Sequence, residues 1–217
     1  MKARVYKSTG SWYTLKDETG KFWNGRMKGV LKLDDITSTN PVAVGDWVDA
    51  TPENDLESTA TINDILSRNN YINRQSPRHK HQHHIVAANL DQSMLIATLR
   101  EPRTSQGFID RFLVASEMYH VAALIVFNKS DIYKSKELEK YEAWKEMYEA
   151  IGYKVLLVSA EKKEGIDELT TLLKGKVTLV SGHSGVGKSS LLNVIFPGMN
   201  LKTGDISGWS GKGQHTT

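Results

Sequence analysis

The chain contains no cysteine among its 217 residues, which excludes disulfides and thiolate metal sites within it. It has only five prolines, and no apolar run approaches the length of a membrane-spanning helix. Residues 1–6 lack the long apolar core of a signal peptide. Hydrophobic residues make up 39% and charged residues 24% of the chain, as in ordinary globular proteins. We therefore expect a cytoplasmic protein with no membrane partner.

The net charge of +3 is too small to indicate nucleic-acid binding by itself, but the charges are unevenly distributed. Residues 1–32 hold eight Lys or Arg and two acidic residues, whereas residues 33–67 hold eight acidic residues and no Lys or Arg. One basic face would suit a phosphate backbone. Solvated charge on a small β domain explains the pattern equally well.

Residues 1–72 are predicted to form a small β-barrel or sandwich. Aromatic and β-branched strand patterns lie at 11–15, 22–26 and 47–50, with turn residues between them, and residues 68–74 are expected to close the unit. Four aromatic residues in these strands either form a face that stacks on nucleic-acid bases or pack in the core. They are Trp12, Tyr13, Phe22 and Trp23.

Residues 73–84 are predicted to be a polar linker. Four histidines lie within it, at positions 79, 81, 83 and 84, and imidazole is a common zinc ligand. No carboxylate or thiolate at a fixed spacing completes a metal site, which favours an interdomain segment.

From residue 85 onward, strand and helix patterns alternate, which predicts an α/β domain with a mainly parallel sheet. The strands are expected at 92–98, 121–127, 154–158 and 177–181, and the helices at 108–116, 135–151 and 165–174.

A phosphate-binding loop follows the last of these strands, because residues 182–189 match the pattern G-x-x-x-x-G-K-[ST]. Backbone N–H groups of such a loop and the following helix N-terminus bind phosphate oxygens. Lys188 can reach the β- and γ-phosphates, and the Ser189 hydroxyl can bind Mg²⁺. A glycine-rich turn can also serve packing alone, but lysine and serine together favour nucleotide binding. The predicted nucleotide-binding residues are Gly182, His183, Ser184, Gly185, Val186, Gly187, Lys188, Ser189 and Ser190.

A second motif, Asn128-Lys129-Ser130-Asp131, follows the strand at 121–127 and suits guanine. The Asp131 carboxylate can accept hydrogen bonds from guanine N1–H and the 2-amino group, whereas adenine would leave it unpaired. The aliphatic stem of Lys129 can lie along the base, and the Asn128 amide can tie the loop to its neighbours. The strand at 154–158 ends in Ser159-Ala160, where a backbone N–H can meet guanine O6.

The two base-binding motifs come first in this sequence and the phosphate loop follows them, whereas common GTPases have the phosphate loop first. The sequence therefore resembles a circularly permuted GTPase. With a β-barrel in front, it resembles the ribosome small-subunit-dependent GTPase A family (RsgA, also called YjeQ or YloQ). The resemblance is carried by residues 128–131 and 182–193 and by Gly45-Asp46-Trp47-Val48, Ala87-Ala88-Asn89-Leu90-Asp91-Gln92 and Gly213-Gln214-His215-Thr216-Thr217.

The resemblance implies an OB-fold barrel at 1–72 that contacts 16S ribosomal RNA, a linker at 73–84 and a permuted P-loop GTPase domain at 85–217. It implies a monomer that uses Mg²⁺ to hydrolyse GTP to GDP, is stimulated by the 30S subunit, and acts late in maturation of that subunit. The alternative function is an RNA- or ribosome-binding module whose G domain binds nucleotide weakly and does not turn over.

Residues 198–217 form a glycine- and serine-rich stretch that corresponds, by the same resemblance, to the first switch. His215 would orient or deprotonate the attacking water, although an exposed loop histidine explains it equally well. Either Thr216 or Thr217 would complete Mg²⁺ coordination, and Thr217 is preferred. The predicted catalytic residues are thus Lys188 and His215, and the predicted metal ligands are Ser189 and Thr217.

The resemblance also implies two parts that this sequence does not contain. These are a D-x-x-G loop and a C-terminal zinc domain, which is the only place where Zn²⁺ is expected. We therefore expect a truncated chain with an incomplete sheet, in which the phosphate-loop strand has an unpaired edge.

Overall fold

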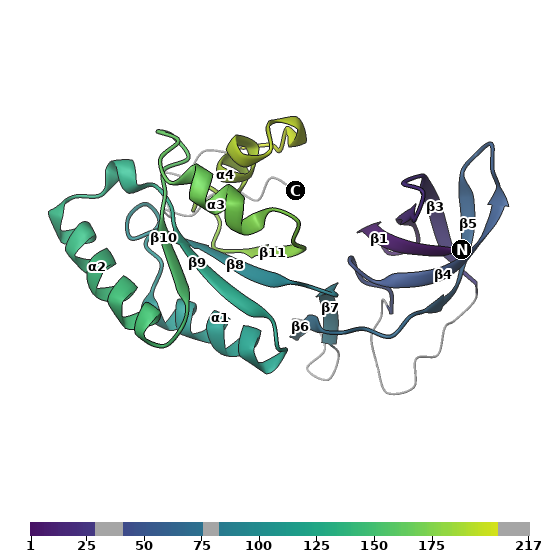
Figure 1. The fold of residues 1–217 in the computed structure, drawn as a ribbon, viewed down its shortest axis with the longest axis horizontal. Helices are drawn as coiled ribbons and strands as arrows, with labels where there is room; N and C mark the ends of the chain where they lie inside the picture. Colours follow the sequence, from purple (N-terminus) through teal and green to yellow (C-terminus); the bar gives the residue numbers. More distant parts are fainter. Residues whose placement is uncertain (29–40, 76–82, 204–217) are drawn as a thin grey trace. The chain divides into compact units, whose positions relative to one another are not determined.

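The computed structural model describes residues 1–28, 41–75 and 83–203. The chain divides into two compact units, Met1–Leu90 and Asp91–Thr217, both drawn in Figure 1. Within the described ranges, no helix combines the length and apolar character needed to cross a membrane.

The first unit contains the predicted small barrel. Five strands close in the order β1-β2-β3-β5-β4, with β3 and β5 parallel and the other described pairs antiparallel. Alternate side chains point inward and form a core that includes Val5, Leu15, Val48 and Ile62. The strands are β1 (Lys2–Ser8), β2 (Tyr13–Asp17), β3 (Phe22–Met27), β4 (Trp47–Asn54) and β5 (Thr59–Ile65).

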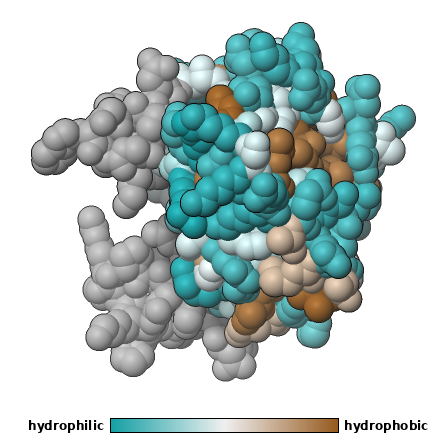
Figure 2. Space-filling view, turned by 90° about the vertical axis from the view of Figure 1, so that its left-hand side faces the viewer, coloured by the Kyte–Doolittle hydropathy of each residue, from teal (hydrophilic) through white to brown (hydrophobic). Residues whose placement is uncertain are grey.

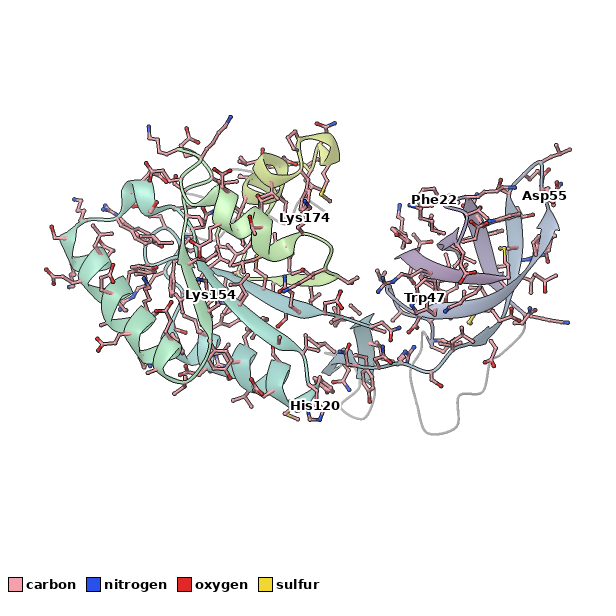
Figure 3. The ribbon with its side chains drawn as sticks, viewed as in Figure 1. Phe22, Trp47, Asp55, His120, Lys154 and Lys174 are labelled. Atoms are coloured by element: carbon pink, nitrogen blue, oxygen red, sulfur yellow. The ribbon has the colours of Figure 1, made fainter. Side chains whose placement is uncertain are left out.

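Two of the four barrel aromatics are buried and two are exposed. Tyr13 and Trp23 are 2% and 5% exposed and belong to the core, as the packing interpretation expects. Trp12 and Phe22 are each 51% exposed, and Phe22 lies on the barrel surface in Figure 3. Tyr13 begins β2 and Trp12 precedes it, so alternation along the chain places them on opposite faces.

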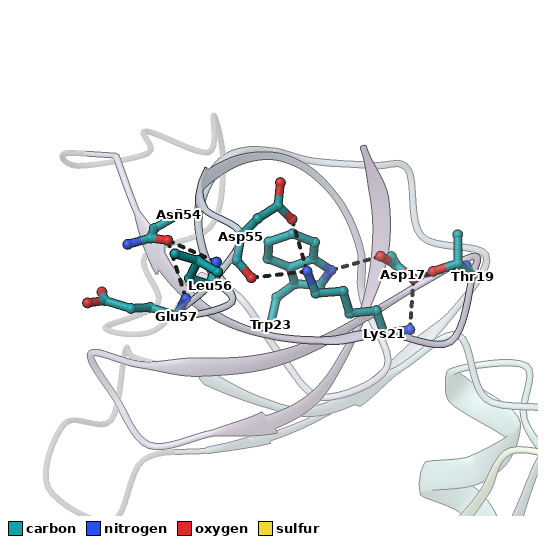
Figure 4. A network of polar contacts seen from close by, with 8 residues as sticks. All are labelled: Asp17, Thr19, Lys21, Trp23, Asn54, Asp55, Leu56 and Glu57. Carbon is teal, nitrogen blue, oxygen red and sulfur yellow. Dashed lines mark hydrogen bonds and ion pairs between the residues drawn. The ribbon is translucent and has the colours of Figure 1, made fainter.

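A polar network joins the β2–β3 turn to the β4–β5 turn (Figure 4). Asp17 accepts hydrogen bonds from the Thr19 and Lys21 backbone N–H groups at 2.9 and 3.0 Å and from Trp23 Nε1 at 2.8 Å. The Lys21 ammonium lies 3.9 Å from the Trp23 ring centroid and donates to Asp55 Oδ1 at 2.9 Å. The hydrogen bonds from the Thr19 side chain and from Trp23 lower the pKa of Asp17 to about 2.

A buried ion pair fixes the loop before β4. Asp46 is 0% exposed and accepts two hydrogen bonds from Arg68, each 2.6 Å long. Arg68 also donates to the Pro41 carbonyl at 2.7 Å, and the Ala43 N–H donates to Asp46 at 2.8 Å. Both charges therefore have hydrogen-bonded partners, which such burial requires.

The region that follows the barrel differs from the sequence prediction. Residues 68–74 were expected to close the barrel, but β1 pairs with β4 and closes it instead. Strand β6 (Tyr71–Gln75) pairs antiparallel with β7 (His83–Ala88) in a separate sheet. The predicted linker at 73–84 therefore begins and ends within this strand pair, and the two units divide at Leu90 rather than at residue 84. The histidine cluster at 79–84 lies outside the residues whose side chains are described.

The second unit is the predicted parallel α/β domain. Four strands lie in the order β10-β9-β8-β11, and every pair is parallel. Among the described residues β11 pairs only with β8, so the phosphate-loop strand has the expected open edge. The strands are β8 (Gln92–Ala97), β9 (Ala122–Phe127), β10 (Lys154–Leu157) and β11 (Thr178–Ser181).

Helices cover both faces of this sheet (Figure 1). Helices α1 (Gln106–Met118) and α2 (Ser135–Ala150) bury Ile109, Leu113 and Tyr148 against one face. Helices α3 (Ile166–Leu173) and α4 (Lys188–Ile195) bury Leu169 and Leu191 against the other. Burial on both faces explains why residues 94–97 of β8 are apolar without alternation. The face of the molecule in Figure 2 is mainly hydrophilic with smaller apolar areas, as is usual for protein surfaces.

Candidate nucleotide-binding site

Three loops that carry the predicted motifs meet at one edge of the sheet. Strand β9 ends at Phe127, just before Asn128, and β11 ends at Ser181, just before Gly182. Strand β10 ends at Leu157, two residues before Ser159. Because these strands are parallel, their carboxyl ends face the same side. This is the edge at which open α/β sheets bind ligands.

The Asn128 side chain connects all three loops, as the sequence predicted. It is 1% exposed, and its Nδ2 donates to the Val186 carbonyl of the phosphate loop at 2.9 Å. Its Oδ1 accepts from the Ala160 N–H at 3.1 Å. Both ends of the amide are thus used to hold the base-binding and phosphate-binding loops at a fixed separation.

Lys129 lies between the phosphate loop and the loop that follows β8. It has a left-handed backbone with φ of 66°, and its Nζ donates to the Glu101 carbonyl at 2.6 Å. Burial is the main cause that lowers the pKa of Lys129, while the nearby Glu101 and Asp131 carboxylates oppose that shift. The bond to Glu101 holds the end of the side chain, and its aliphatic stem is the part predicted to lie along a base.

Asp131 is exposed and held in place by the loop after β10. The Ser159 hydroxyl donates to Asp131 Oδ1 at 2.5 Å and accepts from the Lys162 N–H at 3.0 Å. The Ser130 N–H donates to the Val158 carbonyl at 3.1 Å, which fixes the backbone beside it. The carboxylate is therefore oriented, and it is accessible to a ligand with paired donors.

The Ser159-Ala160 loop differs from the simple expectation of a free N–H for guanine O6. The Ser159 N–H donates to the Glu164 carbonyl at 3.0 Å, and the Ala160 N–H donates to Asn128 Oδ1. A guanine O6 at this point would have to share the Ala160 N–H with Asn128 Oδ1 or take the place of that oxygen.

The phosphate loop requires glycine at two positions, one where backbone lies close and one where a side chain does. A methyl group on Gly182 would lie 2.3 Å from the Ile96 carbonyl oxygen. On Gly187, where φ is +87°, it would lie 2.5 Å from Asn128 Nδ2 and 3.9 Å from Lys129 Cε. Glycine at these positions lets the loop pack directly against β8 and the base-binding loop.

Lys188 begins α4 and folds back across the loop. Its Nζ donates to the Gly182 carbonyl at 2.9 Å and to the His183 carbonyl at 2.7 Å. Burial lowers the pKa of Lys188, and an anionic phosphate beside the ammonium would raise it again. The first turn of α4, which carries half-buried Ser189 and exposed Ser190, has backbone N–H groups without partners in the helix. Such an arrangement suits an anion chemically.

The residues present also fit a magnesium ion bound through a nucleotide. The half-buried Ser189 hydroxyl lies in the same helical turn as Lys188, which places an oxygen ligand beside the phosphate site. In the described part of the chain, no cluster of His, Asp and Glu forms an all-protein cation site. Mg²⁺ commonly takes few protein ligands, together with phosphate oxygens and water.

Two residues of this site were not predicted from the sequence. The Tyr133 hydroxyl accepts from the Leu99 N–H at 2.9 Å and donates to the Asn128 carbonyl at 2.8 Å, and burial raises its pKa. Glu101 supplies the carbonyl that binds Lys129. Neither belongs to a recognisable motif, since their roles depend on β8 and β9 being neighbours. The predicted His215, Thr216 and Thr217 lie outside the described residues.

Comparison with known sequences agrees with these motifs. Residues 65–217 match the family model for the RsgA GTPase, and residues 2–60 match the RsgA N-terminal domain. One relative, small ribosomal subunit biogenesis GTPase RsgA 2 of Bacteroides thetaiotaomicron, is 50% identical over 217 residues, which are 100% of this chain and 69% of that protein. Small ribosomal subunit biogenesis GTPase RsgA of Flavobacterium psychrophilum is 49% identical over 98% of this chain and 66% of its own length. The chain thus spans about two thirds of the length of these curated relatives.

Solved structures share the same fold. YjeQ from Thermotoga maritima superposes with a TM-score of 0.75 and 33% identity, over 98% of this chain and 72% of that chain. YloQ, a circularly permuted GTPase, superposes with a TM-score of 0.67 and 29% identity, over 98% of this chain and 69% of that chain. The barrel, the permuted order of the motifs and the family match agree, and the chain belongs to the RsgA GTPase family.

Proposed function

We propose that this chain binds guanine nucleotide at the edge of the β10-β9-β8-β11 sheet and hydrolyses GTP to GDP there. The observation that carries the proposal is the Asn128 side chain, which holds the guanine motif and the phosphate loop together. Asp131, fixed by Ser159, would accept from guanine N1–H and the 2-amino group. The amides of the loop, with Lys188 and Ser189, would bind the β- and γ-phosphates.

The geometry supports phosphoryl transfer to water, which needs mainly positioning and charge stabilisation. The Lys188 ammonium donates to the Gly182 and His183 carbonyls. A γ-phosphate offers it a charged acceptor instead, so the ammonium would move from these carbonyls to the phosphate. Mg²⁺ bound at Ser189 would neutralise phosphate charge, and His215 and Thr217 remain the candidates for the water and the second ligand.

We also propose that the chain acts in the cytoplasm in maturation of the small ribosomal subunit, because its relatives are named small ribosomal subunit biogenesis GTPases. The barrel would bind 16S ribosomal RNA through an exposed aromatic and basic strip. Tyr6 and Phe22 are about half exposed and meet edge to face at 5.7 Å, with Lys16 Nζ within 5.6 Å of both ring centroids. Lys2 and Arg4 lie over Trp47, which Figure 3 labels on the same barrel.

A hollow on this strip supports the RNA proposal. It has a volume of about 390 Å³ and is lined by Arg4, Tyr6, Lys16 and Trp47 and by residues 17–20, of which Asp17 and Glu18 are acidic. Single-stranded nucleic acid is bound by such combinations of aromatic faces and cations, at about 1–3 kcal/mol for each stacked base. Tyr6→Ala and Phe22→Ala should therefore each weaken binding of single-stranded ribosomal RNA, which fluorescence anisotropy measures.

The nucleotide assignment is tested by Asp131→Asn. An amide presents a donor where guanine also has a donor, whereas the 2-oxo group of xanthine accepts from it. The variant should lose at least about tenfold in GTP affinity, which corresponds to about 1.4 kcal/mol, and gain preference for xanthosine triphosphate. Unchanged GTP affinity with no gain for the xanthine nucleotide would show that Asp131 does not read the base. Tyr13→Phe, in the barrel core, is a matched control that should leave both affinities unchanged.

A further inference from the structure

An aromatic side chain outside every recognised motif contacts the phosphate loop. The Phe108 ring on α1 stacks on the His183 imidazole, with ring centroids 3.8 Å apart and planes 30° apart. His183 is an exposed residue of the loop, and Phe108 is half-buried. The contact joins the helix that follows β8 to the loop that follows β11.

Phe108 itself is held firmly by its surroundings. It packs against the core cluster beneath α1, to which Ile109 and Leu113 contribute with 0% and 4% exposure. The loop before α1 is closed by hydrogen bonds from the Thr104 N–H to the Thr98 carbonyl at 2.7 Å and from the Thr98 N–H to Thr104 Oγ1 at 3.1 Å. The ring therefore presents a fixed surface to whatever stacks on it.

His183, in contrast, belongs to the part of the loop that must receive phosphate. Gly182 before it lies directly against the Ile96 carbonyl of β8. The Gly182 and His183 carbonyls both accept from Lys188 Nζ, the group proposed to bind the β- and γ-phosphates. The stack thus holds the residue whose own carbonyl positions the Lys188 ammonium.

We propose that Phe108 is a positioning residue for the nucleotide, acting through His183 to keep the phosphate loop in its binding conformation. This inference rests on the proposed function, because it concerns the same site. A loop that is already ordered loses less conformational freedom when the phosphates bind, and the affinity is higher as a result.

The energy of an aromatic pair sets the size of the effect. Such pairs are worth about 0.5–1.5 kcal/mol beyond their buried area, so loss of the stack should weaken nucleotide binding about two- to twelvefold. Because the loop contacts phosphates in both nucleotides, GDP and GTP should weaken together. The KM for GTP should rise while kcat stays nearly constant, as for binding that is uniform in the ground and transition states.

The test compares two substitutions on the same helix with N-methylanthraniloyl-GDP as the probe. Phe108→Leu removes the ring but keeps an apolar side chain in the core. Phe112→Leu is the matched control, because Phe112 is one turn further along α1 and packs against the same cluster. Fluorescence titration gives both the dissociation constant and the number of binding sites for each variant, and thermal unfolding reports stability.

The proposal expects Phe108→Leu to raise the dissociation constant with an unchanged number of sites, and Phe112→Leu to leave the dissociation constant unchanged. Phe108→Tyr keeps the ring and should have wild-type affinity. Combined with His183→Ala, Phe108→Leu should add no further loss, because both changes remove the same contact.

Three results would overturn the positioning role. These are equal affinity of Phe108→Leu and wild type, equal loss in both leucine variants, and fully additive losses with His183→Ala. Failure of the wild-type chain itself to bind the probe would instead refute the proposed function, so the two failures are distinguishable.

Discussion

Replacement of Asn128 by alanine should destabilise the second unit and weaken its hold on nucleotide. The change removes the donor to the Val186 carbonyl and the acceptor of the Ala160 N–H, in a side chain that is 1% exposed. Each buried polar group left unsatisfied costs about 1–3 kcal/mol. Partial solvation of the loops reduces the sum, and we expect the free energy of unfolding to fall by about 2–4 kcal/mol.

The effect on nucleotide affinity follows from the loss of the same two hydrogen bonds. Without them, the base-binding and phosphate-binding loops are no longer held at a fixed separation, and the nucleotide must order them when it binds. An ordering cost of only about 1.4 kcal/mol lowers the affinity for GDP tenfold.

The assay is urea unfolding followed by circular dichroism at 222 nm, because the described helices all belong to the second unit. Asn63→Ala is the control, since Asn63 is half-buried in the barrel and its bonds to Asp49 and Thr51 are exposed to solvent. Gly187→Ala should reproduce the loss, because its methyl group would lie 2.5 Å from Asn128 Nδ2. A fall of less than about 0.5 kcal/mol for Asn128→Ala, the range of ordinary surface substitutions, would refute the reasoning.

Two further predictions concern the barrel. Asp46→Ala leaves Arg68 buried and without its carboxylate, so urea unfolding should show a loss of about 3–5 kcal/mol. Asp55→Ala removes an ion pair with Lys21 in which Asp55 is 80% exposed, so it should lower the free energy of unfolding by at most about 1 kcal/mol. Equal losses for Asp46→Ala and Asp55→Ala would contradict this account. Asp17 has a folded-state pKa of about 2, below its ordinary value of 3.8, so its stabilising contribution is present above about pH 4 and is lost as pH falls through 2. The difference in melting temperature between wild type and Asp17→Asn should therefore shrink between pH 4 and pH 2, and a constant difference would show that the Asp17 charge is not responsible.

The sequence predicted the second unit more completely than the barrel, for a physical reason. Strands buried on both faces contain unbroken apolar runs that are easily recognised, such as residues 94–97 of β8. Strands β1 and β5 were missed because only alternate residues are buried, and polar or charged residues stand between them. The pairing of β6 with β7 joins segments on either side of a polar stretch, and no local signal indicates it.

The sequence likewise predicts one part of the candidate site and not the other. The phosphate loop and the guanine motif are short local patterns, so the sequence identified Asn128, Asp131, Lys188 and Ser189. The contacts that position them come from distant residues. Tyr133 contacts Leu99, which is 34 positions away, and Phe108 on α1 contacts His183 in the phosphate loop. Both contacts depend on the strand order rather than on any sequence pattern.

Strand order also explains why a permuted chain can keep the site. The loops are assembled by the neighbours of β8, which lies between β9 and β11, and not by the direction in which the chain connects them. The bond from Asn128 to Val186 spans 58 positions and holds the two loops together although they are distant in the sequence. Closing so long a loop costs little more than closing a shorter one, because the entropy of loop closure grows only with the logarithm of length. The order in which the chain connects the base-binding and phosphate-binding loops can therefore differ, whereas the Asn128 amide is needed in either order.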